Sequence, residues 1–240
     1  MGFTFDIVTD VLLLVFWVKY ESMFRNKPQE SGSLRSPWVV SLFERHIIPD
    51  VERYFNVKLV MDGTQKDDGT GTPNVQDKNL LQSFDGERVA PCLANANNRY
   101  IFSYHPHGVF PGTALILPFT EQWRCHLGWN ALHCVTVHAA GIIFNVPMVR
   151  DFLLRLGGRV VTRSALESSL EQGNSVMIVT GGQTEMLHTK YSDNEMHLVT
   201  HHHGFLKLAI KHQVPAVPLV CFAENNVMDN IHVPWLQKRM

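Results

Sequence analysis

Short apolar runs separated by glycine, proline and polar clusters recur from residue 100 to the end of the chain. The runs at 100–105, 134–137, 159–162, 175–180 and 217–222 predict strands. Amphipathic segments at 147–156, 164–173 and 204–212 predict the helices between them. Strands that alternate with helices are typical of an α/β fold, in which a layered, largely parallel sheet is flanked by helices. Because the strands lack apolar–polar alternation, we expect both faces of the sheet to be covered.

Three features refine this pattern in the helical parts. Residues 31–37 form a linker, with Ser36 as the expected N-cap and Pro37 in the first turn of a helix. Apolar residues at helical spacing continue over 38–47, and we expect Pro49 to end this helix. Ser164 and Glu167 predict a capping box at the start of a later helix.

The remaining segments before residue 100 predict a strand, a loop and an apolar amino-terminal stretch. Residues 54–60 predict a short strand, and 61–98 predict a surface-loop insertion. The amino-terminal stretch contains an unbroken apolar run at 11–18, which is too short for the ~20 residues that span a bilayer. A membrane-associating segment and a buried core helix both remain open. We therefore divide the chain into a hydrophobic segment with linker, 1–36, and a domain, 37–240.

Composition narrows the class of protein. The net charge of −1 argues against a dedicated nucleic-acid binder, whose surface would be basic. The four cysteines are widely spread and form no CxxC pair, which argues against a disulfide scaffold or a structural zinc site. A reducing, cytosol-facing environment is expected.

Candidate chemistry lies at the end of the predicted strand 100–105, in the motif His105-Pro106-His107-Gly108. In an extended chain His105 and His107 face the same side, and Gly108 permits a tight turn or close approach to a ligand. Paired imidazoles suit proton transfer, although loop histidines are also common without any catalytic role. A second motif, Gly181-Gly182-Gln-Thr-Glu185, follows another predicted strand. Parallel strands place their carboxyl ends at one edge, so the two motifs are expected to line one crevice.

The order of these motifs, followed by His203-Gly204-Phe205-x-Lys207-x-Ala209, resembles the type-2 diacylglycerol acyltransferase family. This family includes the monoacylglycerol and wax-alcohol acyltransferases. The resemblance covers roughly residues 35–235, and it implies a glycerolipid-acyltransferase-like fold. Supporting matches are Pro147-Met-Val-Arg150, Gly157-Gly158 with Arg163, Val217-Pro218 and Phe222-x-Glu224-Asn225. The family normally continues beyond the position of Met240, so we expect the carboxyl terminus to be incomplete.

The resemblance also implies which residues act. Catalysis is expected from His105, His107 and Glu185. The expected substrate-binding residues are Gly108, Arg150, Arg163, Gly181, Gly182, Gly204, Phe205, Glu224 and Asn225. Related glycerolipid acyltransferases carry an aspartate five residues after the histidine, but here those positions hold Phe110 and Gly112. The carboxylate that orients the histidine is therefore expected to be Glu185 or Glu121.

The implied activity is transfer of a fatty acyl group from acyl-CoA to the hydroxyl of a diacylglycerol, a monoacylglycerol or a long-chain alcohol. The alternative is a catalytically impaired, lipid-binding or regulatory relative of the same fold. The implied setting is the lipid bilayer of the endoplasmic reticulum, or a lipid-droplet surface. No cofactor, metal or nucleic acid is expected, even at His201-His202-His203, and homo-oligomerisation is left open.

Overall fold

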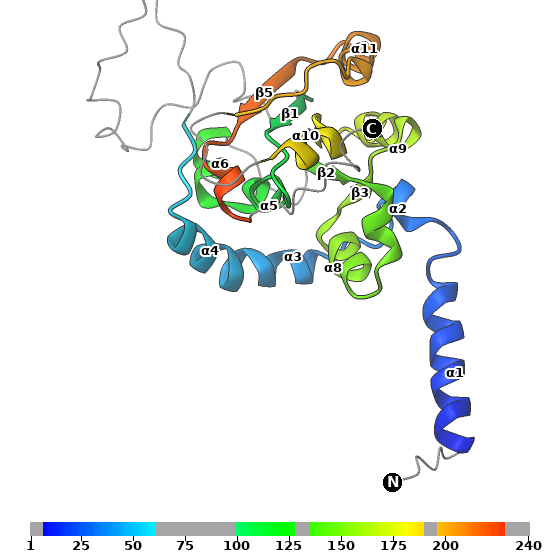
Figure 1. The fold of residues 1–240 in the computed structure, drawn as a ribbon. Coiled ribbons are helices and arrows are strands. Elements are labelled where there is room, and N and C mark those ends of the chain that lie inside the picture. The colour runs from blue at the N-terminus through cyan, green and yellow to red at the C-terminus, as the bar shows by residue number, and fades with distance from the viewer. Residues whose placement is uncertain (1–6, 61–98, 128–134, 190–195, 229–240) are drawn as a thin grey trace, which may run out of the picture.

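A five-stranded parallel sheet forms the centre of the molecule (Figure 1). The computed structural model describes residues 7–60, 99–127, 135–189 and 196–228. The strands are β1 (Ile101–His105), β2 (Val135–Ala139), β3 (Arg159–Val160), β4 (Ser175–Val179) and β5 (Ala216–Val220). They lie in the order β3-β2-β4-β1-β5, and every neighbouring pair is parallel. The predicted α/β layout with a parallel sheet is confirmed.

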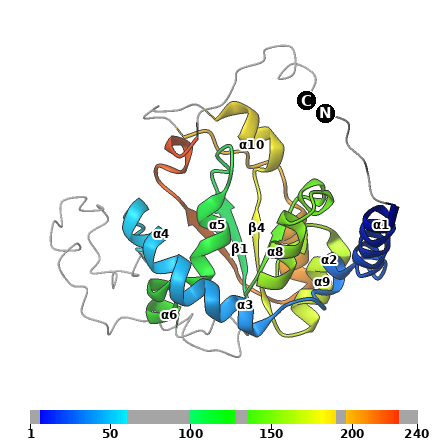
Figure 2. The ribbon, with the colours of Figure 1, turned by 90° about the horizontal axis from the view of Figure 1, so that it is seen from below.

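Helices cover both faces of the sheet, and the inner strands β1 and β4 contribute alternate residues to each side. Figure 2 shows the helices α3, α4, α5 and α8 over one face. There Phe102 and Tyr104 of β1 pack with Trp123 of α6. On the other face Ile101 and Ile178 pack with α9 and α11. Because side chains alternate along a strand, Ser103 and His105 follow Ile101 toward the α9–α11 face.

The helices of this layered domain are short. They are α5 (Gly112–Ile116), α6 (Glu121–Leu127), α8 (Val149–Leu156), α9 (Arg163–Glu171), α10 (Gly182–His188) and α11 (Gly204–His212), with 3-10 helices η3 (Leu117–Phe119), η4 (Gly141–Asn145) and η5 (Glu224–Asn226). The predicted helices at 147–156 and 204–212 are confirmed. The predicted capping box is wrong, because Thr162 caps α9 by accepting from the Ala165 N–H at 3.3 Å. Glu167 instead pairs with Arg163 and Lys211.

A helical arm precedes the sheet and consists of α3 (Pro37–Leu42), the π-helical η1 (Phe43–Ile47) and α4 (Ile48–Phe55). The predicted start is confirmed, although the Ser36 side chain makes no capping hydrogen bond. The predictions of a helix end at Pro49 and a strand at 54–60 are wrong. Pro49 lies in the first turn of α4, where a missing N–H is tolerated. Asn56, in the left-handed conformation, ends α4, and residues 57–60 form no strand.

The edge strand β5 departs from the prediction that all strands are covered on both faces. β1 is buried almost throughout, whereas alternate residues of β5 are exposed. This difference follows from position, since β1 has a neighbour on each side and β5 pairs only with β1 among the described strands.

The amino-terminal helix α1 (Ile7–Ser22) projects from the body of the molecule, to which it connects through the short α2 (Pro28–Ser31) (Figure 1). The eight apolar side chains from Val11 to Val18 are 50 to 66% exposed, so the buried-core alternative is wrong. At its base Arg150 of α8 lies 3.4 Å from the centroid of the Phe24 ring and pairs with Glu21. Among the described helices, none combines the length and apolarity needed to cross a membrane. The predicted loop at 61–98 lies outside the described residues.

Candidate active site

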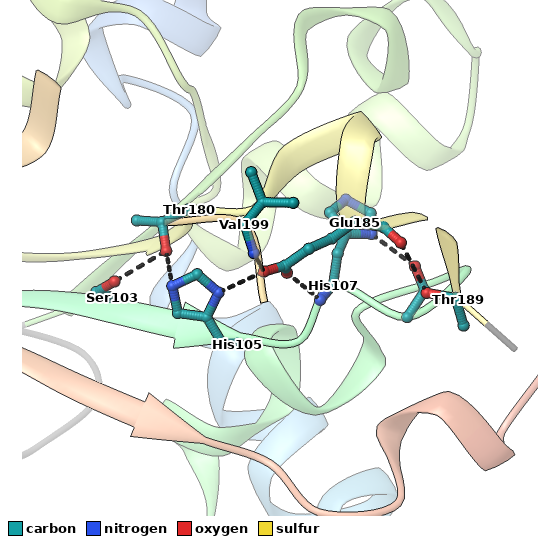
Figure 3. Close-up of polar contacts among 8 residues, drawn as sticks. Ser103, His105, His107, Thr180, Glu185, Thr189 and Val199 are labelled. Carbon is teal, nitrogen blue, oxygen red and sulfur yellow. Dashed lines mark hydrogen bonds and ion pairs between the residues drawn. The ribbon is translucent and has the colours of Figure 1, made fainter. Parts of the chain in front are cut away.

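The two sequence motifs meet at the carboxyl ends of β1 and β4, as predicted (Figure 3). The strands are in register with Tyr104 opposite Val179, so His105 and Thr180 follow side by side. The His105 imidazole lies between two partners. Its Nδ1 is 2.7 Å from Oε1 of Glu185, and its Nε2 is 2.5 Å from Oγ1 of Thr180. Of the two carboxylates that the sequence proposed for orienting a histidine, the geometry selects Glu185 over Glu121.

Glu185 is buried, and its carboxylate accepts hydrogen bonds from three donors. Besides His105, the backbone N–H of Val199 donates to Oε1 at 2.7 Å and that of His107 donates to Oε2 at 2.8 Å. Burial by itself raises the pKa of Glu185, but the hydrogen bonds from His105, Val199 and His107 outweigh this effect and hold the pKa below its ordinary value. The side chain is therefore a carboxylate at neutral pH.

The charge of Glu185 decides the tautomer of His105. A carboxylate only accepts hydrogen bonds, so Nδ1 of His105 carries the proton that it donates to Glu185. In the neutral imidazole, Nε2 then holds the free electron pair. This arrangement leaves Nε2 as the basic atom of the pair.

Gly181 makes room for this carboxylate. A Cβ atom built at Gly181 would overlap the carboxyl group of Glu185, which curls back over the turn that opens α10. The glycine that precedes Glu185 by four residues is thus a steric requirement of the dyad. This requirement is a physical reason for the Gly-Gly-x-x-Glu spacing.

The His107 ring is placed differently from the His105 ring. The sequence placed both imidazoles on the same side of an extended chain, but β1 ends at His105. The ring Nδ1 of His107 lies 2.9 Å from the Gly108 carbonyl oxygen, and only its backbone N–H reaches Glu185. The two imidazole rings therefore have different hydrogen-bond partners, and a catalytic role for His107 stays a prediction.

Gly108 brings the backbone close to a second buried carboxylate, Glu224. Gly108 has φ +61°, and a Cβ there would lie 3.2 Å from the Glu224 side chain. Glu224 accepts from the Tyr104 hydroxyl at 2.7 Å and from the Cys221 thiol at 3.3 Å. Burial and the neighbouring Glu224 raise the pKa of Tyr104, so its hydroxyl remains a donor. The predicted site residue Glu224 thus packs against the loop after His107, and Asn225 follows it in η5.

Sequence reasoning missed the hydroxyl groups at the other nitrogen of His105. The Thr180 Oγ1 lies 2.8 Å from the Ser103 Oγ, and both side chains are buried. The signal available in the sequence was the presence of polar residues in otherwise apolar strands. Ser103 interrupts an aromatic strand, and Thr180 stands between a run of apolar residues and Gly181.

A cavity of about 490 Å³ opens beside Thr180 on the α9–α11 face. Arg163 and Lys207 give it cationic groups, while Leu166, Ile178 and Leu208 give it an apolar wall. The predicted binding residues Gly204 and Phe205 line it, together with His201, His202 and His203. In the described ranges, no cluster of three or more His, Cys, Asp or Glu residues is arranged to hold a metal ion.

Arg150 is the predicted site residue that lies elsewhere. Its contacts are with Glu21, Tyr20 and Phe24 at the base of α1. A role for Arg150 in substrate binding stays a prediction.

A basic imidazole nitrogen supported by a buried carboxylate, next to a cavity, is the arrangement of an enzyme that moves a proton to or from a hydroxyl group. The family model described as "Diacylglycerol acyltransferase" matches residues 91–238, which include all the residues of this site. The chain belongs to the diacylglycerol acyltransferase family.

Curated relatives agree with this membership. Diacylglycerol O-acyltransferase 1 of Eremothecium gossypii is 37% identical over 158 residues, which cover 63% of this chain and 33% of that protein. Diacylglycerol O-acyltransferase 2 of Xenopus tropicalis is 30% identical over 237 residues, which cover 95% of this chain and 56% of that protein. The chain therefore spans between a third and a little over half of the length of these relatives. No solved structure matches the chain.

Proposed function

We propose that this protein transfers a fatty acyl group from acyl-CoA to the hydroxyl of a diacylglycerol, which yields triacylglycerol. A monoacylglycerol or a long-chain alcohol is an acceptor of the same chemistry. The observation that carries the proposal is the His105–Glu185 pair, with its 2.7 Å hydrogen bond, at the carboxyl end of the sheet. Membership of the diacylglycerol acyltransferase family supplies the reaction class.

In this proposal His105 is the general base and Glu185 is its positioning carboxylate. An alcohol is un-ionised at neutral pH, so its attack on a thioester requires removal of its proton. Nε2 of His105 accepts that proton, and the Glu185 carboxylate stabilises the resulting imidazolium. The backbone N–H groups near Gly108 and at Gly181–Gly182 are candidate donors to the oxyanion. The reaction scheme needs no metal or cofactor.

The cavity beside Thr180 offers complementary surfaces for an acyl-CoA. Arg163 and Lys207 carry charges opposite to those of the phosphate groups. Leu166, Ile178 and Leu208 form an apolar wall suited to the acyl chain. Both substrates of the reaction have long apolar parts, which favours a site of this mixed character.

We assign α1 to the surface of a membrane, where the acceptor lipid resides. Its eight consecutive apolar residues rise about 12 Å along the helix axis, which is less than half of the ~30 Å hydrocarbon core. The helix therefore suits insertion into one leaflet, with Lys19 at the polar boundary. The endoplasmic reticulum membrane and the lipid-droplet surface are the locations that this assignment proposes.

The test is acyl transfer from radiolabelled oleoyl-CoA to dioleoylglycerol in membranes that contain the full chain. The His105→Ala variant is expected to lose at least about 100-fold of the activity, since the basic nitrogen is gone. His107→Ala keeps the backbone N–H that reaches Glu185, so its loss is expected to be smaller. His46→Ala removes an exposed histidine on the helical arm and is the matched control.

The results separate the alternatives. If wild-type protein esterifies none of the three acceptors, and His105→Ala leaves its binding of oleoyl-CoA unchanged, the protein is a lipid-binding or regulatory relative. If His107→Ala proves more harmful than His105→Ala, the assignment of the base is wrong.

A further inference from the structure

We propose that Thr180 is a covalent nucleophile, which carries the acyl group as an ester between its release from CoA and its transfer to the acceptor. This inference rests on the proposed function and adds an intermediate to it. The inference starts from the Thr180 hydroxyl, which forms a hydrogen bond with Nε2, the basic nitrogen of His105.

The direction of the hydrogen bonds follows from Glu185. Since Nδ1 of His105 donates to the carboxylate, Nε2 has only an electron pair to offer, and the Thr180 hydroxyl must donate to it. Because the Thr180 hydroxyl proton is already donated to His105, the Ser103 hydroxyl must donate to Thr180 Oγ1. The result is a hydroxyl, an imidazole and a carboxylate in series, which is the arrangement of a base-activated nucleophile.

The position of Thr180 in the fold agrees with this role. It directly follows β4 and precedes the turn at Gly181–Gly182 that begins α10. Nucleophiles of several α/β enzymes occupy such a turn between a strand and a helix. Strand-end threonines more commonly bond to nearby backbone groups, whereas the Thr180 hydroxyl bonds to an imidazole and to Ser103.

The cavity provides a second, independent observation. Thr180 lines it together with Arg163 and Lys207, while His105 does not line it. A thioester placed in this cavity would lie against Thr180. Direct attack by the acceptor would require its hydroxyl to displace Thr180 from Nε2, although both Thr180 and Ser103 are buried and hydrogen-bonded.

The two half-reactions balance. In the first half-reaction, Thr180 Oγ1 attacks the thioester carbonyl, and the hydroxyl proton of Thr180 passes to His105 Nε2. The C–S bond then breaks, and the proton passes from Nε2 to the CoA sulfur. The esterified Thr180 can no longer donate, so Nε2 becomes free. In the second half-reaction, His105 Nε2 takes the proton of the acceptor hydroxyl, and the acceptor oxygen attacks the Thr180 ester. The bond between the acyl carbon and Thr180 Oγ1 then breaks, and the proton passes from Nε2 to Thr180 Oγ1.

The experiment is to incubate the full chain, in acceptor-free membranes, with radiolabelled oleoyl-CoA, followed by acid quenching, denaturing electrophoresis and peptide mapping. We expect protein-bound label at Thr180 that alkaline hydroxylamine releases and that chases into triacylglycerol when dioleoylglycerol is added. Thr180→Ser keeps a hydroxyl and should still be labelled, whereas Thr180→Ala and the isosteric Thr180→Val should not be labelled.

Thr136→Val is the matched control, since Thr136 is a buried threonine on β2 of the same sheet. It should retain the label, which separates chemistry at Thr180 from the general effect of removing a buried hydroxyl. Label on Thr180→Ala, or label mapped to another residue, overturns the inference. Triacylglycerol synthesis with no trapped label overturns the inference but leaves the proposed function standing. The absence of both label and product overturns both, and label without transfer to any acceptor supports the inference while refuting the acceptor assignment.

Discussion

The absence of a side chain at one residue, Gly181, leaves room for the Glu185 carboxylate beside His105. Glu185 reaches His105 only because Gly181 has no side chain, since a Cβ atom there would occupy the space of the carboxyl group. Backbone N–H groups of His107 and Val199 then complete the shell of donors around Glu185. The position of the proposed base therefore depends on the absence of a side chain at Gly181.

The substitution Gly181→Ala tests this dependence. The added methyl group is expected to displace the Glu185 carboxylate and to lower acyl transfer at least about 100-fold, since His105 then lacks its positioning carboxylate. Oleoyl-CoA binding, measured in parallel, should change far less than the rate.

Gly141→Ala is the control for this substitution. A Cβ at Gly141 would meet its nearest atom, in Val160, at an ordinary contact distance of 3.6 Å. We expect the Gly141→Ala variant to keep its activity. Comparable losses in the two variants would show that the effect at Gly181 is not steric exclusion by Glu185.

At this scale the sequence predicted part of the site. His105 and the glycine turn stand in motifs at the ends of apolar strands, and the resemblance to the acyltransferase family then singled out Glu185. Thr180 and Ser103 could not be selected, because a hydroxyl residue at a strand end usually has local backbone partners. Only the register between β1 and β4 shows that these two hydroxyls lie next to His105.

At the scale of elements, one buried histidine on β2 forms hydrogen bonds with both β3 and α9. His138 of β2 lies within 2.9 Å of the Val160 carbonyl oxygen of β3 and 3.0 Å of the Ser169 hydroxyl of α9. Burial lowers the pKa of His138 to about 4, and the positive charge of nearby Arg159 acts in the same direction, although the hydrogen bond to Val160 opposes it. The folded protein thus holds this imidazole neutral.

This burial predicts acid sensitivity. Between pH 6.5 and 4 the unfolded chain binds a proton at His138 that the folded chain does not, so stability is complete above pH 6.5 and falls as the pH decreases. The group accounts for roughly 3 kcal/mol over that range, at about 1.4 kcal/mol per pKa unit. Urea unfolding between pH 7.5 and 4.5 should show a smaller loss of stability in His138→Asn than in the wild type.

The pH range and the control isolate this contribution. The lowered pKa of Glu185 means that its own contribution persists above about pH 4.5 and is lost only at lower pH. His46→Asn alters an exposed histidine and should leave the wild-type slope unchanged. Equal slopes for the wild type and His138→Asn would contradict a neutral, buried His138.

The limits of prediction at this scale have physical causes. Residues 54–60 have a strand-like composition, but the first part of this segment completes α4, whose amino-terminal turn tolerates Pro49. The burial of strands depends on sheet order, which no local pattern encodes, and so the edge position of β5 was missed. The alternation of strands and helices was predictable because it depends on runs of apolar residues alone.

At the scale of the whole molecule, two apolar systems serve different purposes. The interior is filled by the sheet and its helices, and it leaves His105 at the carboxyl end of β1, next to Thr180, which lines a cavity. The apolar residues of α1 lie outside this interior, on a helix whose base is fixed by Arg150 against Phe24. Burial of α1 therefore requires a surface outside the described part of the chain.

The proposed membrane role of α1 predicts a specific effect of Leu13→Asp. Insertion of a leucine side chain into lipid contributes about 1.5–3 kcal/mol to the free energy of membrane binding. An aspartate at this position loses that contribution and also places a charge in the apolar region. We expect the partition of the protein onto phosphatidylcholine vesicles, measured by flotation, to fall at least about tenfold, which corresponds to 1.4 kcal/mol. Ile210→Asp places the same charge on an exposed apolar position of α11 and should leave flotation unchanged. If both variants float like the wild type, α1 does not bind the bilayer, and its exposed apolar residues must contact another protein surface.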